Sequence, residues 1–339
     1  MRKHRKHRAR RLAPTVGPVV AVAVVLAATG HAHGSTAPSE RSPGPRLTTP
    51  ANTLATALDC PQGVGADRDP VLLVPGGGGE PSLIFAAGLE PVLRAEGYPV
   101  CTVTLPDAAF GDLQVQAEYV VAAIRTMASE SARPVSVIGV SQGGPVARWA
   151  LKWWRDVRLL VGDVIGLAPS NHGFALAPAL CGGPCPPATR QQIAGSRFLT
   201  VLNRGDETPG GGRVAYSVIF SETDANVPPP FPDLKGESDD TNTAVQEICP
   251  GRQVDHGHIQ YDAVAIALVL DALGHNGPAR ASRVGSAACE TRYPEGVDPV
   301  AVDLEIASAL RHFFANFTVA GLTEVEPPLK SYVPGLRRS

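Results

Sequence analysis

The chain has 339 residues, of which 44% are hydrophobic and 18% charged, a composition that excludes an intrinsically disordered protein. Seven of its 30 basic residues lie in the first eleven positions, and without those seven, 23 basic residues face 32 acidic ones. A net charge of −9 for the remainder argues against nucleic acids and anionic membrane surfaces as partners.

The basic start is followed by ten small apolar residues, Val19–Ala28, and then by small-x-small cleavage sites. This is the pattern of a secretory signal peptide, and the apolar run is too short to span a bilayer. We therefore predict a signal peptide over residues 1–32, a secreted protein and no transmembrane anchor. Residues 33–52, rich in Ser, Pro and Thr, are predicted to be a flexible lead, followed by a single domain over 53–339.

Strand and helix patterns alternate along this domain. Short apolar, β-branched runs predict strands at Pro70–Val74, Tyr98–Leu105, Val135–Val140, Val161–Leu167 and Val214–Phe220. One-sided apolar spacing predicts helices at Ala86–Glu96, Gln114–Ser129, Pro145–Trp154, Asp262–Leu273 and Val302–Phe314. The alternation indicates the α/β class, with a mainly parallel central sheet and helices on both faces.

Two Pro- and Gly-rich segments, around residues 170–209 and 227–240, interrupt this pattern. Long loops in a compact α/β domain are often functional, so we expect lids or pocket walls there. Whether residues 191–204 form a helix inside the first segment stays open at this point.

The pentapeptide Gly139-Val140-Ser141-Gln142-Gly143 lies between a predicted strand and a predicted helix. It fits G-x-S-x-G, in which the serine occupies a sharp strand-to-helix turn with its hydroxyl exposed above the sheet. The motif alone arises often by chance. Its position at the carboxyl edge of a parallel sheet, where ligands bind, makes Ser141 a candidate nucleophile.

A nucleophilic serine needs a base and an acid, which follow it in the order Asp, His in this architecture. Of the histidines after Ser141, His172 precedes the plausible acids, whereas His275 and His312 lie in or beside late helices, where a solvated position is the simpler interpretation. His256 and His258 remain as candidate bases. The same pair could start a zinc site, but no third ligand is evident.

Asp224 is the candidate acid because it follows directly on the predicted strand that ends at Phe220. It therefore lies in a loop at the same edge of the sheet as the serine. Glu222 is the local alternative, and Asp206 and Asp163 are more remote ones.

Hydrolysis by serine also needs donors for the oxyanion. One candidate is the backbone N–H of Gln142, the residue after the nucleophile, and a second must come from the glycine loop Gly76–Gly79. The alternatives for this loop are a flexible connector or a phosphate-binding loop. No G-K-[ST] or G-x-G-x-x-G sequence follows, which argues against a nucleotide site.

Six cysteines, an even number, suit an oxidising compartment and up to three disulfides, for which the sequence allows 15 pairings. Cys181 and Cys185 are close enough in sequence to close a small loop. A metal site at that pair lacks nearby partner cysteines or histidines.

Taken together and in order, six segments resemble the secreted α/β-hydrolase lipases of the Candida antarctica lipase B-like family, over about residues 59–289. They are Leu73-Val74-Pro75-Gly76, Gln116-Ala117-Glu118-Tyr119-Val120, Ser141-Gln142-Gly143-Gly144, Leu167-Ala168-Pro169-Ser170-Asn171-His172-Gly173, Thr223-Asp224 and Val254-Asp255-His256. The resemblance implies an α/β-hydrolase fold and a bacterial relative of these enzymes. It also implies Ser141 as nucleophile, Asp224 as acid and His256 rather than His258 as base, with Gly77 and Gln142 as oxyanion donors.

The resemblance further implies disulfides Cys60–Cys101 and Cys249–Cys289, which leaves Cys181 to pair with Cys185. The chain departs from the family's yeast enzyme at Gly77, where that enzyme has a threonine whose hydroxyl adds a donor, and at Ser170, where it has an aspartate. The loop from Asn171 to Asn203 also matches poorly.

These observations predict a secreted serine carboxylester hydrolase, a lipase acting on acylglycerols, that needs no metal or organic cofactor. We expect a monomer with ester substrates and transient contact with a lipid–water interface. An esterase of short or polymeric esters is the nearest alternative. A non-catalytic secreted binding protein on the same scaffold is an alternative of another class.

Overall fold

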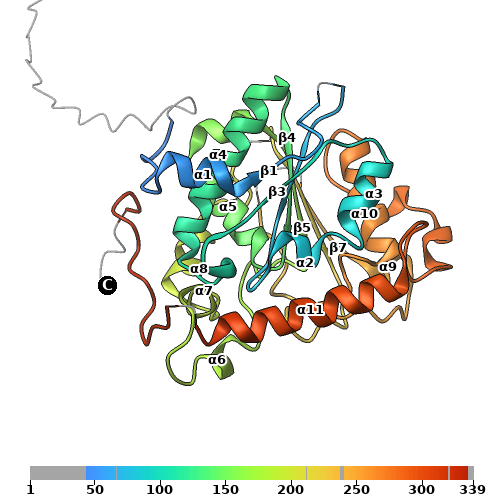
Figure 1. The fold of residues 1–339 in the computed structure, drawn as a ribbon. Coiled ribbons are helices and arrows are strands. Elements are labelled where there is room, and N and C mark those ends of the chain that lie inside the picture. Colours follow the sequence, from blue (N-terminus) through green and yellow to red (C-terminus); the bar gives the residue numbers. More distant parts are fainter. Residues whose placement is uncertain (1–42, 66, 211, 237–239, 320, 335–339) are drawn as a thin grey trace, which may run out of the picture. The chain divides into compact units, whose positions relative to one another are not determined.

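The computed structural model describes residues 43–334 apart from 66, 211, 237–239 and 320 (Figure 1). The predicted signal peptide and residues 33–42 of the predicted lead lie outside the described residues. The rest of that lead contacts the domain, since the N–H groups of Thr48 and Thr49 donate to Glu118 and Trp154 Nε1 donates to the Pro45 carbonyl. No described helix is both long and apolar enough to cross a membrane.

Seven strands form one sheet in the order β1-β3-β2-β4-β5-β6-β7. Only the edge strand β1 runs antiparallel to its neighbour, so the prediction of a mainly parallel sheet is confirmed. The strands are β1 (Leu58–Asp59), β2 (Val71–Val74), β3 (Val100–Val103), β4 (Val135–Val140), β5 (Val161–Leu167), β6 (Ala215–Phe220) and β7 (Asp240–Ala244).

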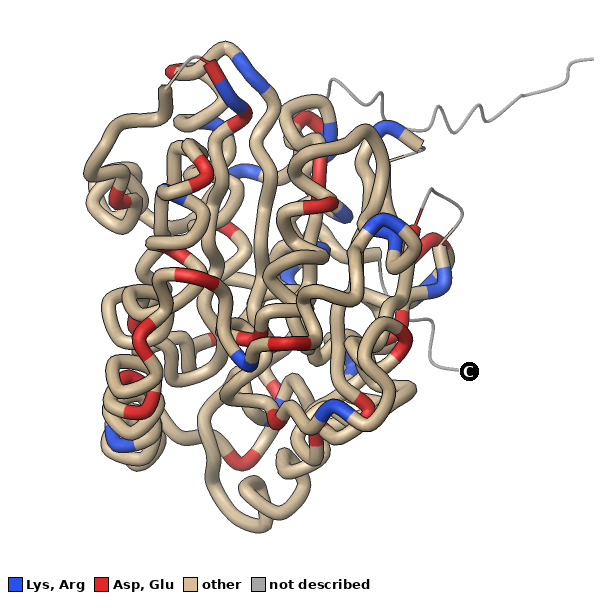
Figure 2. The backbone as a smooth tube through the Cα atoms, turned by 90° about the vertical axis from the view of Figure 1, so that its right-hand side faces the viewer, with Lys and Arg blue, Asp and Glu red and all other residues tan. Residues whose placement is uncertain are grey.

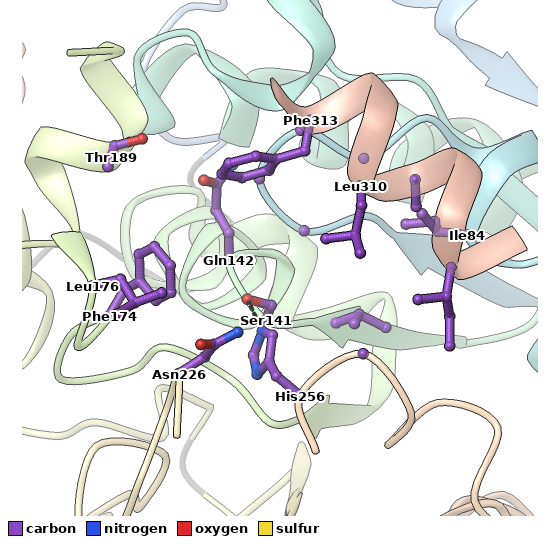
Figure 3. Close-up of a pocket in the computed structure, with 18 of the residues that line it drawn as sticks. Ile84, Ser141, Gln142, Phe174, Leu176, Thr189, Asn226, His256, Leu310 and Phe313 are labelled. Carbon is purple, nitrogen blue, oxygen red and sulfur yellow. Dashed lines mark hydrogen bonds between the residues drawn. The ribbon is translucent and has the colours of Figure 1, made fainter. Parts of the chain in front are cut away.

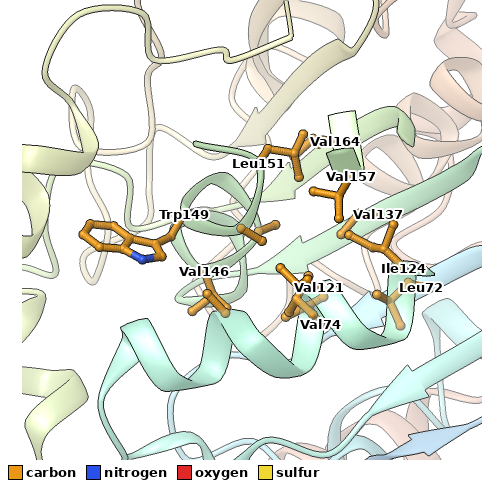
Figure 4. Packing of buried hydrophobic residues seen from close by; sticks show 14 of the residues in the cluster. Leu72, Val74, Val121, Ile124, Val137, Val146, Trp149, Leu151, Val157 and Val164 are labelled. Carbon is orange, nitrogen blue, oxygen red and sulfur yellow. The ribbon is translucent and has the colours of Figure 1, made fainter. Parts of the chain in front are cut away.

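The inner strand β2 shows why polar and apolar residues do not alternate along these strands. All four of its residues are buried, with Leu72 and Val74 packing into the core on one face of the sheet and Val71 and Leu73 into the core on the other. A parallel strand covered on both faces needs an apolar residue at every position. In Figure 4, Leu72 and Val74 face Val121 of the helix that covers the first face.

Helices cover both faces of the sheet (Figure 1). One face carries α4 (Leu113–Ser131) and α5 (Gly143–Trp153), and the other carries α3 (Leu89–Ala95) and α10 (Ala263–Gly274). The last helix, α11 (Pro299–Phe317), runs across the carboxyl edge of the strands. The short helices are α1 (Ala51–Ala57), α2 (Pro81–Ile84), α6 (Ala177–Leu180), α7 (Pro187–Gln191), α8 (Arg197–Leu202) and α9 (Val245–Ile248).

Four 3₁₀ turns complete the described elements: η1 (Pro106–Ala109), η2 (Arg155–Leu159), η3 (Ala281–Arg283) and η4 (Ser286–Cys289). The question left open for residues 191–204 is answered by α8, whose first turn is capped by Ser196 accepting from the Leu199 N–H at 3.2 Å. The first Pro- and Gly-rich segment therefore contains three short helices rather than one long loop.

Two contacts fix α11 in place at the edge of the sheet. Glu305 accepts the Ala87 N–H at 2.6 Å and the Tyr261 hydroxyl at 2.7 Å. At the other end of the helix, the ring of Phe313 packs edge-on against Phe110 with 5.1 Å between centroids. Glu305 and Phe313 thus hold α11 against segments that follow strand ends. The helix therefore forms a wall of the site at the carboxyl edge of the sheet.

A half-buried carboxyl near the start of β5, away from the carboxyl edge of the sheet, makes stability depend on pH. Asp163 pairs in register with Ser136 of β4, whose hydroxyl donates to it at 3.1 Å, and burial raises the pKa of Asp163 to about 6. The unfolded chain releases this proton near pH ~3.9, so the folded state loses stability as pH rises from about 4 to about 6.

We therefore expect Asp163→Asn to raise the free energy of unfolding by about 1–2 kcal/mol at pH 8 and to change it little at pH 4, because the protonated wild-type carboxyl resembles the amide. Urea unfolding at the two pH values measures the difference. An equal effect of the substitution at both values would contradict this explanation.

Candidate active site

Ser141 occupies the sharp turn between β4 and α5 in a left-handed conformation, with φ 53°. Such a conformation is strained for a residue with a side chain and is kept only when its surroundings enforce it. The flanking glycines explain how the turn fits. A Cβ on Gly139 would lie 2.5 Å from the backbone of Gly143, and one on Gly143 would collide with the Val74 carbonyl oxygen. The two glycines of the motif are thus required by close backbone packing.

The structure brings Ser141, His256 and Asp224 into one hydrogen-bonded row. His256 Nε2 lies 2.9 Å from Ser141 Oγ, and His256 Nδ1 lies 2.7 Å from Asp224 Oδ2 (Figure 3 shows the Ser141–His256 pair). The other oxygen of the buried Asp224 accepts the N–H groups of Asn226 at 2.7 Å and Val227 at 3.0 Å. The Asp224 carboxylate faces the Nδ1–H of His256. The imidazole therefore presents the lone pair of Nε2 to the serine hydroxyl.

The alternative bases pair elsewhere. His258 Nδ1 lies 2.8 Å from Asp255, His172 Nε2 lies 3.2 Å from Glu207, and His275 Nδ1 lies 3.3 Å from Asp271. Among the residues that the structure describes, no group of three or more His, Cys, Asp or Glu side chains could hold a metal ion.

The two predicted oxyanion donors lie beside the serine. A Cβ on Gly76 would lie 3.1 Å from the Ser141 Cβ, and one on Gly77 would lie 2.9 Å from Gln142 Oε1, so the glycine loop runs against the turn. Within the described part of the chain, neither the Gly77 N–H nor the Gln142 N–H donates a hydrogen bond. Both donors are therefore available to a ligand.

Hydrogen bonds with buried amide side chains hold the Gln142 side chain. Their positions in the sequence do not reveal that these side chains meet. Gln142 Nε2 donates to the Ala109 carbonyl at 2.7 Å and to Gln116 Oε1 at 2.8 Å, while Gln142 Oε1 accepts from Gln192 Nε2 at 2.7 Å. Gln192 in turn accepts the Ser170 hydroxyl at 2.7 Å. Four helices and loops thereby meet at the residue after the serine and fix its backbone.

A cavity of about 300 Å³ opens over Ser141. Figure 3 shows Phe174 and Leu176 on one side of the serine and Ile84 and Leu310 on the other. The predicted wall segment 170–209 supplies part of the lining, but the largest apolar share comes from α11, for which the sequence suggested no such role. Those α11 residues are Ile306, Ala309, Leu310, Phe313 and Phe314.

Among the residues that the structure describes, no Lys, Arg, Asp or Glu lines this cavity. Acidic and basic residues are instead interspersed along the chain in Figure 2. A largely apolar pocket with a few convergent polar groups is typical of a site for small, mainly hydrophobic ligands. The site therefore suits an uncharged molecule with a hydrocarbon part.

Three disulfides join the same pairs that the family resemblance implied. Cys60–Cys101 ties the end of β1 to β3, and Cys249–Cys289 ties the end of α9 to η4. Cys181–Cys185 closes the turn after α6, next to the pocket residue Leu180.

Two known proteins, both called lipase B, are similar to this chain in sequence or structure. Lipase B of Pseudozyma antarctica is 29% identical over 300 residues, which are 85% of this chain and 86% of that protein. The crystal structure of Aspergillus fumigatus lipase B superposes with a TM-score of 0.80 at 28% identity, covering 86% of this chain and 74% of that one. The chain is a homologue of lipase B. No protein-family model matches this lipase B homologue.

The similarity confirms two expectations from the sequence. The resemblance to lipase B-like enzymes holds over most of the chain, and the fold is that of an α/β-hydrolase. The roles of individual site residues rest on the geometry described above.

Proposed function

We propose that this lipase B homologue is a serine carboxylester hydrolase, most specifically a lipase. The observation that carries the proposal is the row Ser141–His256–Asp224, with distances of 2.9 and 2.7 Å, whose serine and histidine line a largely apolar pocket. Both relatives named above are called lipases, which supports the same reaction class.

In the first half of the reaction, Ser141 Oγ attacks the ester carbonyl carbon while His256 Nε2 takes the hydroxyl proton. Asp224 holds the ring through Nδ1–H and stabilises the imidazolium that forms. The negative charge that develops on the carbonyl oxygen is stabilised by the N–H groups of Gln142 and Gly77, which have no competing acceptor among the described residues.

In the second half, the bond between the carbonyl carbon and the alcohol oxygen breaks, and His256 returns its proton to the departing alcohol. Water then attacks the acyl-enzyme on Ser141 by the same route, with His256 again as base, and the free acid leaves. These side chains and N–H groups complete the cycle without an added cofactor.

The surface around the pocket mouth supports a lipid substrate. Leu310, Phe314 and Leu176 line the pocket and are 54%, 63% and 47% exposed. Large exposed apolar side chains gathered at one place mark interaction sites. We propose that this rim contacts the lipid–water interface transiently and that the protein acts there as a monomer.

We also propose that the protein is secreted. The basic and apolar start of the sequence and three disulfides support an oxidising, extracellular location. Recovery of the mature protein from the culture medium tests this.

Labelling with a fluorophosphonate tests the function. We expect one adduct per chain, located at Ser141 by peptide mass spectrometry, and release of fatty acid from emulsified triolein as well as from soluble short-chain esters. Adducts with no triolein hydrolysis would favour the esterase alternative, and no adduct and no hydrolysis would favour a binding protein. Loss of activity with a chelator would favour the zinc site at His256 and His258.

A further inference from the structure

Some polar side chains of the pocket form hydrogen bonds within the protein, and others do not. Gln142 and Gln192 bind each other, and the Tyr261 hydroxyl donates to Glu305. Two polar side chains of the pocket, those of Asn226 and Thr189, form no hydrogen bond with another described residue. Figure 3 shows Thr189 far from the serine, whereas the Asn226 carboxamide points toward Ser141 and His256.

The main chain alone holds Asn226 in place. Its N–H donates to Asp224 at 2.7 Å, and its carbonyl accepts the Ala175 N–H at 2.8 Å. Because the side chain contributes to neither contact, its carboxamide is presented to the pocket without a structural task. Asn226 is only partly buried, so its carboxamide loses water when a ligand fills the pocket, and that loss costs free energy unless the ligand supplies hydrogen bonds in return.

The chemistry at His256 indicates which part of the substrate meets this carboxamide. The leaving alcohol oxygen must lie within hydrogen-bond reach of His256 Nε2 to take its proton. The carbonyl oxygen is held instead by Gln142 and Gly77. Asn226 follows Asp224 and lies on the His256 side of the serine, so it faces the alcohol part of the ester.

We propose that Asn226 is a specificity residue that hydrogen-bonds a second hydroxyl on the alcohol part of the substrate. A carboxamide both donates and accepts, which matches a hydroxyl group. The preferred class is therefore esters of polyhydric alcohols that keep a free hydroxyl, such as partial glycerides, over esters of simple alkanols. This inference rests on the proposed ester hydrolysis at Ser141.

Two esters with the same acyl group test the inference: 3-hydroxypropyl octanoate and butyl octanoate, which differ only in a terminal hydroxyl against a methyl. We measure kcat/KM for both with the wild type and with Asn226→Leu, which keeps the size and removes the hydrogen bonds. The hydroxyl-to-methyl ratio is expected to fall about fivefold to tenfold in the variant. A ratio unchanged within twofold, even with lower activity on both esters, overturns the proposal.

Matched controls separate this role from others. Thr189→Val removes the hydroxyl of the other pocket side chain that forms no hydrogen bond with a described residue, and it should leave the ratio unchanged. Moving the hydroxyl to the acyl part, in ethyl 3-hydroxyoctanoate against ethyl octanoate, should give a ratio that Asn226→Leu does not alter. A change in that pair alone overturns the assignment to the alcohol side.

Two further results keep the test decisive. If Asn226→Leu does not fold, Asn226→Ala supplies the same ratio. A folded wild type that hydrolyses none of the four esters refutes the proposed function itself, whereas an active wild type whose ratio does not respond to position 226 refutes only the role of Asn226.

Discussion

Replacing Ser141 by alanine is expected to lower kcat for ester hydrolysis by about 10⁵-fold to 10⁶-fold, because no other group can form the acyl-enzyme. His256 would keep its contact with Asp224, and the donors Gln142 and Gly77 would keep their places, so substrate binding should change little. Hydrolysis of 4-nitrophenyl butanoate, with circular dichroism to confirm folding, measures the effect.

Ser170→Ala is the matched control for this substitution. Ser170 is buried in the same region, and its hydroxyl donates only to Gln192, whereas its contact with the Ser141 carbonyl is made by the backbone N–H, which alanine keeps. We expect its kcat to fall by no more than about tenfold, as for the loss of one neutral hydrogen bond. If Ser141→Ala kept more than a hundredth of wild-type activity, Ser141 would not be the nucleophile.

Asp224→Asn is expected to lower kcat by about 10⁴-fold while leaving the fold intact. The reason lies in how Asp224 is held. Its Oδ1 accepts the N–H groups of Asn226 and Val227, and an asparagine oxygen can continue to do so. The amide NH₂ must then face His256 Nδ1, where it can only donate. That forces the proton of the ring onto Nε2, and the imidazole can no longer accept the proton of Ser141.

Asp255→Asn provides the comparison, since Asp255 also pairs with a histidine, His258, at 2.8 Å, but is 65% exposed. We expect its kcat to stay within about threefold of the wild type, because a solvent-exposed pair contributes little. A large loss of kcat with Asp255→Asn and a small loss with Asp224→Asn would indicate that the catalytic pair is Asp255–His258 and not Asp224–His256. Rates of 4-nitrophenyl butanoate hydrolysis from pH 6 to 9 give both values.

Much of the fold could be predicted because its central strands are buried on both faces. Runs such as Val71–Val74 and Val135–Val140 carry apolar or small residues at every position, and this pattern is local. The turn at Ser141 could be predicted for a related reason. Gly139 and Gly143 are dictated by backbone contacts within or next to the same strand.

The elements that escaped prediction have no such local pattern. Strand β7, with the sequence Asp240-Thr241-Asn242-Thr243-Ala244, is polar and is a strand because β6 pairs with it in register. Strand β1 has two residues, too few for any periodicity. Helices α6 and α7 carry proline in their first turn, where a helix tolerates it. Within a Pro-rich segment, these prolines predict a loop instead.

The candidate site shows the same division. The order of serine, aspartate and histidine is visible along the chain, but spacing could not choose between His256 and His258, which are two residues apart. Only the fold directs one ring to Asp224 and the other to Asp255. Likewise, the spacing of apolar residues in α11 predicts a helix, but it does not predict which segment the helix packs against. That Phe313 packs on Phe110 depends on contacts some 200 residues apart.

That last helix has a consequence for the order in which the protein matures. During synthesis, Ser141, Asp224 and His256 all leave the ribosome before Pro299–Phe317 does. Until α11 arrives, Gly78 lacks the Phe313 ring that covers it and Tyr261 lacks its acceptor Glu305. In a nascent chain, Ser141 and His256 therefore precede the α11 residues that line the cavity over them. The apolar wall that α11 adds to the cavity is one of the last parts of the site that the growing polypeptide supplies.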